Sequence, residues 1–472
     1  MLVEKMKGLY RMNLAGYILG TAGRVGVIFA GYMGSVPLML AFTAIAALGM
    51  APWQGDMGAV VASCSEYTYL TKHKHIDGTM YSCTSFGTKI GGGIGVALCG
   101  WLLDASGFVK EAAVQPASCM NMLHIMYLWI PMILSLVITF IMSEIAIDEL
   151  LEKWDEEHVL TKEEALAILN LPDDKLDKLI ETAYALRLKY KGKKVSIQLL
   201  TNVRSGNCSQ NCAYCAQSCE SHAAIEKYKR VSDEKLYGDN DLVDEKHLAR
   251  HCIGLSGISF TDAEIEDLAD RIRKMKKNDT QICCSIGFLT EKQARMLKDA
   301  GLNRINHNLN SSRSYYPNIC TTHTYDQRIN NIRMLKSIGF EMCCGGIIGM
   351  GESKSDVVDM LMDIREINPE SVPINFLLPI KGTRLADRDI SGLTQQYCLK
   401  VLCLARLMVP KSDIRCAAGR EVYFKGIEPT LFKVVDSIFA SGYLTAGGQG
   451  IDDTLNMIKE AGFTGEIEST DR

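Results

Sequence analysis

The chain has 472 residues, 47% of them hydrophobic, and a formal net charge of -4 from 51 basic and 55 acidic side chains. A chain of this length usually holds more than one structural unit. The near-neutral charge, without any run of five basic residues, gives no electrostatic footprint for nucleic acid, so we expect no nucleic-acid partner. Seventeen cysteines, an odd number with thirteen of them after residue 200, fit reduced thiols that hold metal better than paired disulfides.

The first third is much more apolar than the rest. Apolar stretches lie near residues 14–33, 36–63, 84–103 and 125–143. Each has close to the ~20 residues that a membrane helix needs. Buried soluble helices are the alternative, but the run YLWIPMILSLVITFIM from Tyr127 to Met142 has neither a charge nor a polar face. Basic residues before the first stretch and between the second and third predict four spans with both ends in the cytoplasm.

Two segments of this region carry a resemblance. They are SEYTYLTKHKHIDGTMYS and, shortly after it, SFGTKIGGGIGVALCGWLLDASGF. Over residues 10–145 the chain is similar to the last four helices of a sugar-cation symporter of the major facilitator type. In that family the substrate and the coupling ion bind between two six-helix halves. The resemblance therefore implies a partial transporter-like membrane domain, residues 1–145, that does not transport by itself.

The composition turns acidic and helix-forming after the apolar third, from SEIAIDELLEKWDEEH onward. Thr161 followed by Glu164 has the spacing of a capping box, which begins a new helix. We therefore place a domain boundary near residue 150, an acidic linker at residues 146–160 and a second domain at residues 161–472.

The second domain alternates β-prone runs with amphipathic helices. Runs such as QICCSIGF and DIRCAAG are separated by helical segments such as EKQARMLKDAG. Repeated βα units predict an α/β fold, a (βα)8 TIM-type barrel of parallel strands, preceded by the all-α membrane segment. In such a barrel the chemistry gathers at the carboxyl ends of the strands, where Cys, Asn and Arg cluster in this sequence.

The strongest chemical signal is the CxxxCxxC pattern of Cys208, Cys212 and Cys215, which follows the strand-like run SIQLLTNV. A 4Fe-4S cluster normally takes four cysteines, so three cysteines leave one iron open to a small molecule. A structural zinc site is the alternative, but zinc prefers four closed ligands, commonly as two CxxC pairs, and no second pair follows. The pattern resembles that of radical S-adenosylmethionine (SAM) enzymes. The resemblance implies that SAM binds the open iron and is cleaved to a 5′-deoxyadenosyl radical.

Four later segments resemble, in sequence and in order, segments of the biotin synthase family. They are RHCIGL, CCSIGFLTE, CCGGIIGMGE and IRCAAGRE. The resemblance covers about residues 155–465. It implies that Cys252, Cys283, Cys343 and Arg415 hold an auxiliary iron–sulfur cluster, usually 2Fe-2S, whose sulfide is inserted into the substrate.

The neighbouring cysteines leave the type of this cluster open. Arginine is a poor metal ligand because its pKa lies above ~12. Cys284, Cys344 and Cys416 lie beside the expected ligands. Any of them could replace Arg415 or support a four-iron cluster, and Cys416 is the first substitute. Packing on the reverse face of each strand is the alternative, because adjacent strand residues point to opposite sides.

Several amides and a glycine-rich strand complete the predicted site. Side-chain amides offer both donors and acceptors to a neutral polar substrate. The resemblance implies that Asn306, Asn308 and Asn375 bind the ureido ring of dethiobiotin. It implies contacts with SAM from Tyr214, Asn310, Ile347, Gly349 and Glu352, with Asn310 at a position that is usually Asp. A phosphate-binding loop is the alternative for GGIIGMGE, but no Gly-Lys-Ser or Gly-Lys-Thr follows it.

Together, the resemblances predict sulfur insertion between C6 and C9 of dethiobiotin to give biotin, with two SAM molecules consumed. The implied partners are a flavodoxin or ferredoxin as electron donor, a second barrel in a homodimer, and the membrane, with the catalytic domain in the cytoplasm. A different radical SAM reaction on the same barrel is an alternative. Such a reaction would not need Cys252, Cys283 and Cys343 together with the three asparagines. The alternative of another class is a truncated symporter-type membrane protein with a regulatory or unrelated radical SAM domain. If the fusion is not genuine, the enzyme is expected in the cytoplasm.

Overall fold

The computed structural model describes residues 9–72, 77–112, 114–152, 154, 158–276, 280–440 and 449–465. The chain divides into two compact units, Met1–Leu150 and Leu151–Arg472. The described residues of the first unit form helices and no strand, and the second unit is an α/β barrel.

The N-terminal unit consists of long apolar helices. They are α2 (Leu9–Tyr32), α3 (Val36–Lys72), α4 (Asp77–Ala105), α5 (Ala117–His124), the π-helical segment η1 (Ile125–Trp129) and α6 (Ile130–Glu152). By length and composition, the described residues include four helical segments that could cross a membrane: Met12–Tyr32, Val36–Ala59, Gly78–Ala105 and Ala117–Ile141. The predicted all-α segment with four membrane-length helices is confirmed.

Helices α2 and α3 approach each other closely because small residues line their contact. A Cβ at Gly23 would lie 2.7 Å from the backbone nitrogen of Ala46. Small residues allow such close packing in a membrane, where the hydrophobic effect does not drive helices together. On another face of α2, Thr21 shares a hydroxyl hydrogen bond of 2.6 Å with Ser135 of α6. Small and hydroxyl side chains thus hold this unit together.

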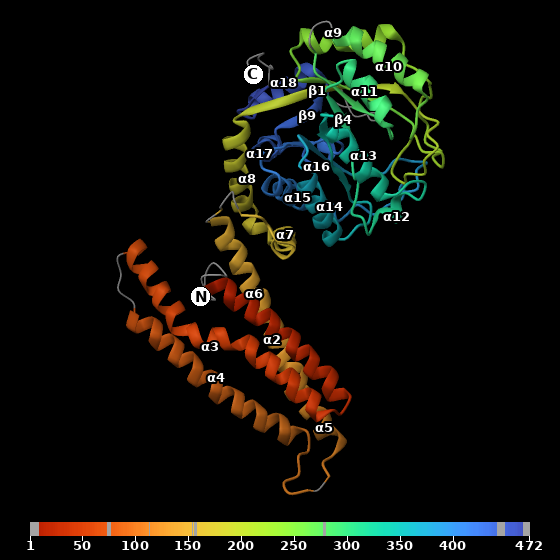
Figure 1. The fold of residues 1–472 in the computed structure, drawn as a ribbon. Coiled ribbons are helices and arrows are strands. Elements are labelled where there is room, and N and C mark those ends of the chain that lie inside the picture. Colours follow the sequence, from red (N-terminus) through yellow and green to blue (C-terminus); the bar gives the residue numbers. More distant parts are fainter. Residues whose placement is uncertain are drawn as a thin grey trace. The chain divides into compact units, whose positions relative to one another are not determined.

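The second unit is a closed barrel of parallel strands (Figure 1). The strands are β1 (Lys194–Arg204), β2 (Arg250–Leu255), β3 (Ile282–Ser285), β4 (Arg304–Asn306), β5 (Glu341–Cys343), β6 (Gly346–Ile348), β7 (Ser371–Phe376), β8 (Asp413–Cys416), β9 (Ser437–Ala440) and β10 (Thr464–Gly465). β1 pairs with both β2 and β9, which closes the barrel, and β10 adds to the start of β1. β5 and β6 share one position beside β7, so the barrel has eight strand positions. The predicted (βα)8 fold is confirmed.

The break between β5 and β6 has a local cause. Pro373 lies in the middle of β7 and has no backbone N–H to donate to the ladder. Cys343 and Gly346, on the two sides of the break, keep the same register with β7. Gly345 fits between them because a Cβ at this position would clash with the carbonyl group of Pro373. β5 and β6 are therefore two segments of one barrel strand. Cys343 ends the first segment, and the glycine-rich sequence forms the second.

The second unit also contains helices, most of which surround the strands (Figure 1). They are α7 (Lys162–Leu169), η2 (Asp173–Lys175), α8 (Leu176–Lys191), α9 (Asp233–Glu245), α10 (Asp262–Met275), α11 (Glu291–Asp299), α12 (Tyr316–Ile319), α13 (Tyr325–Ser337), α14 (Lys354–Ile367), α15 (Gln395–Met408), α16 (Arg420–Tyr423), α17 (Glu428–Val434) and α18 (Ile451–Glu460). Helices α7, α10, α11, α13 and α14 each begin with a capping box. The box predicted at Thr161 and Glu164 is confirmed.

Candidate active site

The loop after β1 carries the first thiol set. Gly206 turns the chain there with a left-handed backbone (φ 72°). Gln217 then holds the loop, since its side-chain oxygen accepts a hydrogen bond of 2.9 Å from the Gly206 N–H. Its carbonyl oxygen accepts one of 3.1 Å from the Cys208 N–H. The half-buried thiols of this set, Cys208, Cys212 and Cys215, all line the same cavity.

This cavity, of about 290 Å³, opens at the carboxyl ends of the strands. Among the predicted site residues it is lined by Cys208, Cys212, Tyr214, Cys215, Asn306, Asn308, Asn310, Ile347 and Asn375. Much of the remaining wall is apolar, with residues such as Leu255, Ile286 and Leu377. A largely apolar cavity with a few amides suits a small ligand that has a neutral polar head.

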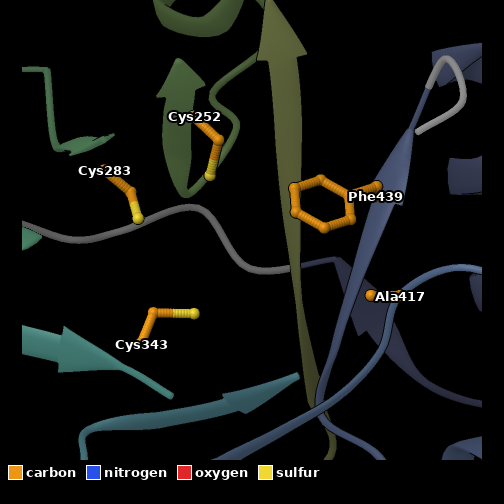
Figure 2. Packing of buried hydrophobic residues seen from close by; sticks show 5 residues of the cluster. All are labelled: Cys252, Cys283, Cys343, Ala417 and Phe439. Atoms are coloured by element: carbon orange, nitrogen blue, oxygen red, sulfur yellow. The ribbon is translucent and has the colours of Figure 1, made fainter. Parts of the chain in front are cut away.

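The second thiol set is buried inside the barrel. Cys252 on β2, Cys283 on β3 and Cys343 on β5 are at most 5% exposed. Figure 2 shows their sulfur atoms directed into one space, near Phe439. Asn306, on the intervening strand β4, donates a hydrogen bond of 3.3 Å from its amide to Cys343 Sγ. Because Asn306 also lines the cavity, it connects the cavity to the second thiol set.

Arg415 on β8 lies beside these thiols. Its Nη1 donates to Cys343 Sγ at 3.6 Å, its Nε to Ser437 Oγ at 2.9 Å and its Nη2 to Ser371 Oγ at 3.1 Å. The guanidinium carbon lies 5.0 Å from the centre of the Phe439 ring. All three nitrogens act as donors in this arrangement, so the protonated guanidinium offers positive charge to the thiols.

Mutual contact and burial set the protonation of these thiols. The hydrogen bond with Cys252, together with burial, raises the pKa of Cys283 to about 12. Burial also raises the pKa of Cys252, but the hydrogen bond from Cys283 and the charge of Arg415 outweigh it and lower this pKa below its usual value. Thiols bind iron as thiolates and release their protons on binding. Three sulfur atoms that converge from nearby strands beside a cation fit an iron–sulfur cluster.

The neighbouring cysteines lie apart from this set. Cys284, Cys344 and Cys416 are buried, and each follows its neighbour on a strand, so each points to the opposite side of the barrel wall. Burial there raises the pKa of the Cys416 thiol. The structure therefore does not bring Cys416 together with the three thiols, and its geometry favours packing over the role of a substitute ligand.

Strand β6 forms the side of the cavity that was predicted to bind SAM. Asn310 has a left-handed backbone (φ 68°) and forms an isolated bridge with Gly346. The Ile347 N–H donates a hydrogen bond of 2.9 Å to the Asn310 carbonyl oxygen. Glu352 turns back so that its Oε1 accepts a hydrogen bond of 2.6 Å from the Gly349 N–H, and burial raises the pKa of this carboxyl group. Ile347 lines the cavity, with Gly349 and Glu352 close behind it in the chain.

Backbone hydrogen bonds fix two of the predicted substrate amides. The Oδ1 of Asn308 accepts from the Gly345 N–H at 3.0 Å. Asn375 donates to the Gly346 carbonyl at 3.0 Å and accepts from the Ala418 N–H at 3.1 Å. Since both amide oxygens are engaged, the groups left for a ligand are N–H donors, which suit a carbonyl oxygen.

Sequence analysis did not predict a further thiol beside Cys212. Cys320 follows the short helix α12, and its Sγ lies 3.8 Å from Cys212 Sγ and 3.2 Å from His323 Nδ1. The ligand atoms of these three residues all lie within 4.8 Å of one another. The run CTTH indicates a local Cys–His pair, but Cys212 is 108 residues away in the chain and no sequence signal connects them.

The barrel and the cysteine loop define a class of protein, the radical SAM enzymes. Residues 202–364 match the Radical SAM superfamily, and residues 373–464 match the Biotin and Thiamin Synthesis associated domain. Methylornithine synthase has a similar structure, with a TM-score of 0.57 at 17% identity, over 68% of this chain and 97% of that chain. The FeFe-hydrogenase maturase of Carboxydothermus hydrogenoformans has a TM-score of 0.59 at 14% identity, over 69% and 80%. These two likenesses show the fold.

Similar sequences identify the family within this class. The biotin synthase of Geobacillus kaustophilus is 41% identical over 312 residues, 66% of this chain and 92% of that protein. The biotin synthase of Bacillus subtilis is 39% identical over 313 residues, again 66% and 92%. The chain belongs to the biotin synthase family, and its cofactors are a 4Fe-4S cluster, SAM and an auxiliary iron–sulfur cluster. Residues 3–149 match the MFS/sugar transport protein family, so both predicted resemblances are confirmed.

Proposed function

We propose that the chain inserts sulfur between C6 and C9 of dethiobiotin and so forms biotin. One observation carries this proposal: the first thiol set lines an amide-lined cavity, and one residue of the cavity wall contacts the second thiol set. Cys212 lines the cavity with its loop, and Asn306 both lines it and donates a hydrogen bond to Cys343. A substrate in this cavity would lie beside the first set and one side chain, that of Asn306, away from the second.

The roles of the site residues are part of the proposal. Cys208, Cys212 and Cys215 hold the 4Fe-4S cluster that binds SAM, and Cys252, Cys283 and Cys343, with Arg415, hold the auxiliary cluster, of 2Fe-2S or four-iron type. When bound, these groups supply an electron that cleaves SAM to a 5′-deoxyadenosyl radical and the sulfur atom that enters the substrate. Tyr214, Asn310, Ile347, Gly349 and Glu352 contact SAM, and Asn306, Asn308 and Asn375 contact dethiobiotin.

The protein's own contribution is to orient the substrate and to exclude water. Asn308 and Asn375 present N–H donors whose directions are fixed by backbone hydrogen bonds. This arrangement suits the carbonyl oxygen of a ureido ring and fixes which carbon atoms face the radical. The apolar wall around Ile286 and Leu377 keeps water away from a reactive carbon radical.

The test uses the full chain, purified in detergent without oxygen and reconstituted with iron and sulfide. With SAM, dethiobiotin and a low-potential reductant, we expect biotin and two molecules of 5′-deoxyadenosine for each biotin. Protein that binds a single cluster, or that cleaves SAM without adding sulfur to dethiobiotin, would contradict the proposal.

We further propose that residues 10–145 hold the enzyme at a membrane as four spans. Both chain ends and the barrel, residues 161–472, then lie in the cytoplasm, with residues 146–160 as the linker. The four membrane-length helices and the match to the transport family support this arrangement. The chain should stay in the membrane pellet after alkaline carbonate extraction, and tags at both ends should be labelled only from the cytoplasmic side. Recovery in the supernatant would argue against the anchor.

A homodimer of barrels and electron transfer from a flavodoxin or ferredoxin complete the proposal. The match of residues 3–149 to a transport family favours one other candidate function, sugar transport. Four spans lack most of a site that forms between two six-helix halves. We therefore expect proteoliposomes with the full chain to take up no more labelled sugar than empty liposomes, and uptake above that level would support transport.

A further inference from the structure

A buried group of hydrogen-bonding side chains lies next to the thiol of Cys212. Cys212 lines the cavity, whereas Cys320 is only 3% exposed and contacts Cys212 from outside the cavity wall. The two sulfur atoms lie 3.8 Å apart, within the range of a hydrogen bond between sulfurs. Cys320 is thus placed to act on a cluster ligand and not on the substrate.

Arg328 sets the direction of the hydrogen bonds in this group. Its Nη2 lies 2.9 Å from His323 Nε2, and a guanidinium can only donate. Nε2 of His323 must therefore accept, so the proton of the neutral ring lies on Nδ1. Nδ1 lies 2.8 Å from Gln210 Oε1 and 3.2 Å from Cys320 Sγ. The amide nitrogen of Gln210 donates a hydrogen bond of 3.1 Å to Ser209 Oγ. The amide oxygen therefore faces His323 as an acceptor.

The same groups resemble a small metal site, since the ligand atoms of Cys212, Cys320 and His323 lie within 4.8 Å of one another. The hydrogen bonds argue against this interpretation. His323 has its proton on Nδ1 and meets a donor at Nε2, so neither ring nitrogen has a free lone pair for a metal. The Nδ1 proton of His323 is instead shared between Gln210 Oε1 and Cys320 Sγ. Cys320 thus accepts from His323, and its own S–H is available to Cys212.

We propose that Cys320 is a positioning residue for the first thiol set, whose S–H donates a hydrogen bond to the Cys212 thiolate and raises the reduction potential of the bound cluster. This inference rests on the proposed role of Cys212 as a cluster ligand. Between the free thiols, Cys212 is the donor in this contact. A Cys212 thiolate that holds iron has no proton, so Cys320 is then the donor between the two sulfurs. A reduced cluster carries more negative charge, and donors to its sulfur atoms stabilise that form.

The test is a redox titration of the full chain, purified in detergent and reconstituted, with the reduced 4Fe-4S cluster followed by electron paramagnetic resonance. Cys320→Ala removes the donor, so the midpoint potential should shift to a more negative value. Cys320→Ser keeps an O–H donor, so its potential should lie closer to that of the wild type. Cys403→Ala is the matched control, since Cys403 is a fully buried cysteine of α15 outside the site, and it should leave the potential unchanged.

Two results would overturn the inference. One is a Cys320→Ala potential equal to those of the wild type and of Cys403→Ala. The other is a loss of iron in both Cys320 variants but not in the control, because Cys320 would then be a ligand. The titration needs neither dethiobiotin nor biotin formation. Its failure is therefore distinct from failure of the proposed sulfur insertion, which would show as a wild type that binds its clusters but makes no biotin.

Discussion

Cys343 and Cys344 are adjacent on the chain but belong to different environments. Cys343 faces Arg415 and Asn306, whereas Cys344 packs on the other side of the barrel wall. Cys343→Ala should remove the auxiliary cluster and reduce biotin formation to background, while SAM binding and the first cluster remain. Cys344→Ala should keep both clusters and cost about 1 kcal/mol of stability through the small cavity that it leaves. Iron and sulfide per chain measure the difference, and equal iron loss in the two variants would contradict these roles.

Asn310 combines a polar side chain at the cavity with a left-handed backbone. Asp tolerates this backbone conformation as Asn does, so Asn310→Asp changes the charge without straining the turn. A hydrogen bond from a ribose hydroxyl to a carboxylate is stronger than one to an amide, so SAM should bind about two- to tenfold more tightly. Equilibrium dialysis with labelled SAM measures this change. Asn310→Ala serves as the comparison, and unchanged affinity in both variants would rule out the contact.

At the scale of the elements, the repeating βα pattern predicted that the thiols and the amides lie on strands or at strand ends, whereas the resemblance to a family predicted which of them form the site. The cysteines of RHCIGL, CCSIGFLTE and CCGGIIGMGE fall on β2, β3 and β5, and the closed barrel turns them into one space. The break between β5 and β6 was not predictable, since its cause, Pro373, lies on the neighbouring strand. The contact of Cys320 with Cys212 depends on tertiary folding in the same way, and no local pattern encodes it.

The capping boxes give a prediction for a single helix. At the start of α10, Thr261 Oγ1 accepts from the Glu264 N–H, and the Glu264 carboxylate accepts from the Thr261 N–H at 2.8 Å. Thr261→Ala should lower the free energy of unfolding by about 0.5–2 kcal/mol, whereas Thr261→Ser should have little effect. Denaturant unfolding of the full chain in detergent measures both variants. Equal stability of the alanine variant and the wild type would show that the box contributes nothing.

The pH dependence of this helix start follows from the same contact. The hydrogen bond from the Thr261 backbone lowers the pKa of Glu264 in the folded chain. A carboxyl group with a lowered pKa stabilises the fold above its unfolded pKa, about 4.3, and this contribution is lost as the pH falls through the folded value. The difference in stability between the wild type and Glu264→Gln should therefore shrink below about pH 4, where the carboxyl group of the wild type becomes protonated. A difference that stays constant down to pH 3 would show that the charge of Glu264 contributes nothing to this helix start.

At the scale of the whole molecule, the chain joins a helical unit and a barrel that each bury their own side chains. Ala30 and Leu128 are buried in the first unit, and Ile305 and Phe376 in the second. A unit with its own core can fold without its neighbour, and exposed apolar helices need a membrane or detergent. Removal of residues 1–150 should therefore yield a barrel that stays in solution without detergent, with the iron content and biotin formation of the full chain. Two results would contradict this prediction: precipitation of the shortened chain, or loss of its clusters under conditions in which the full chain keeps them. Either result would show that the barrel depends on the helical unit and that the anchor is part of the enzyme.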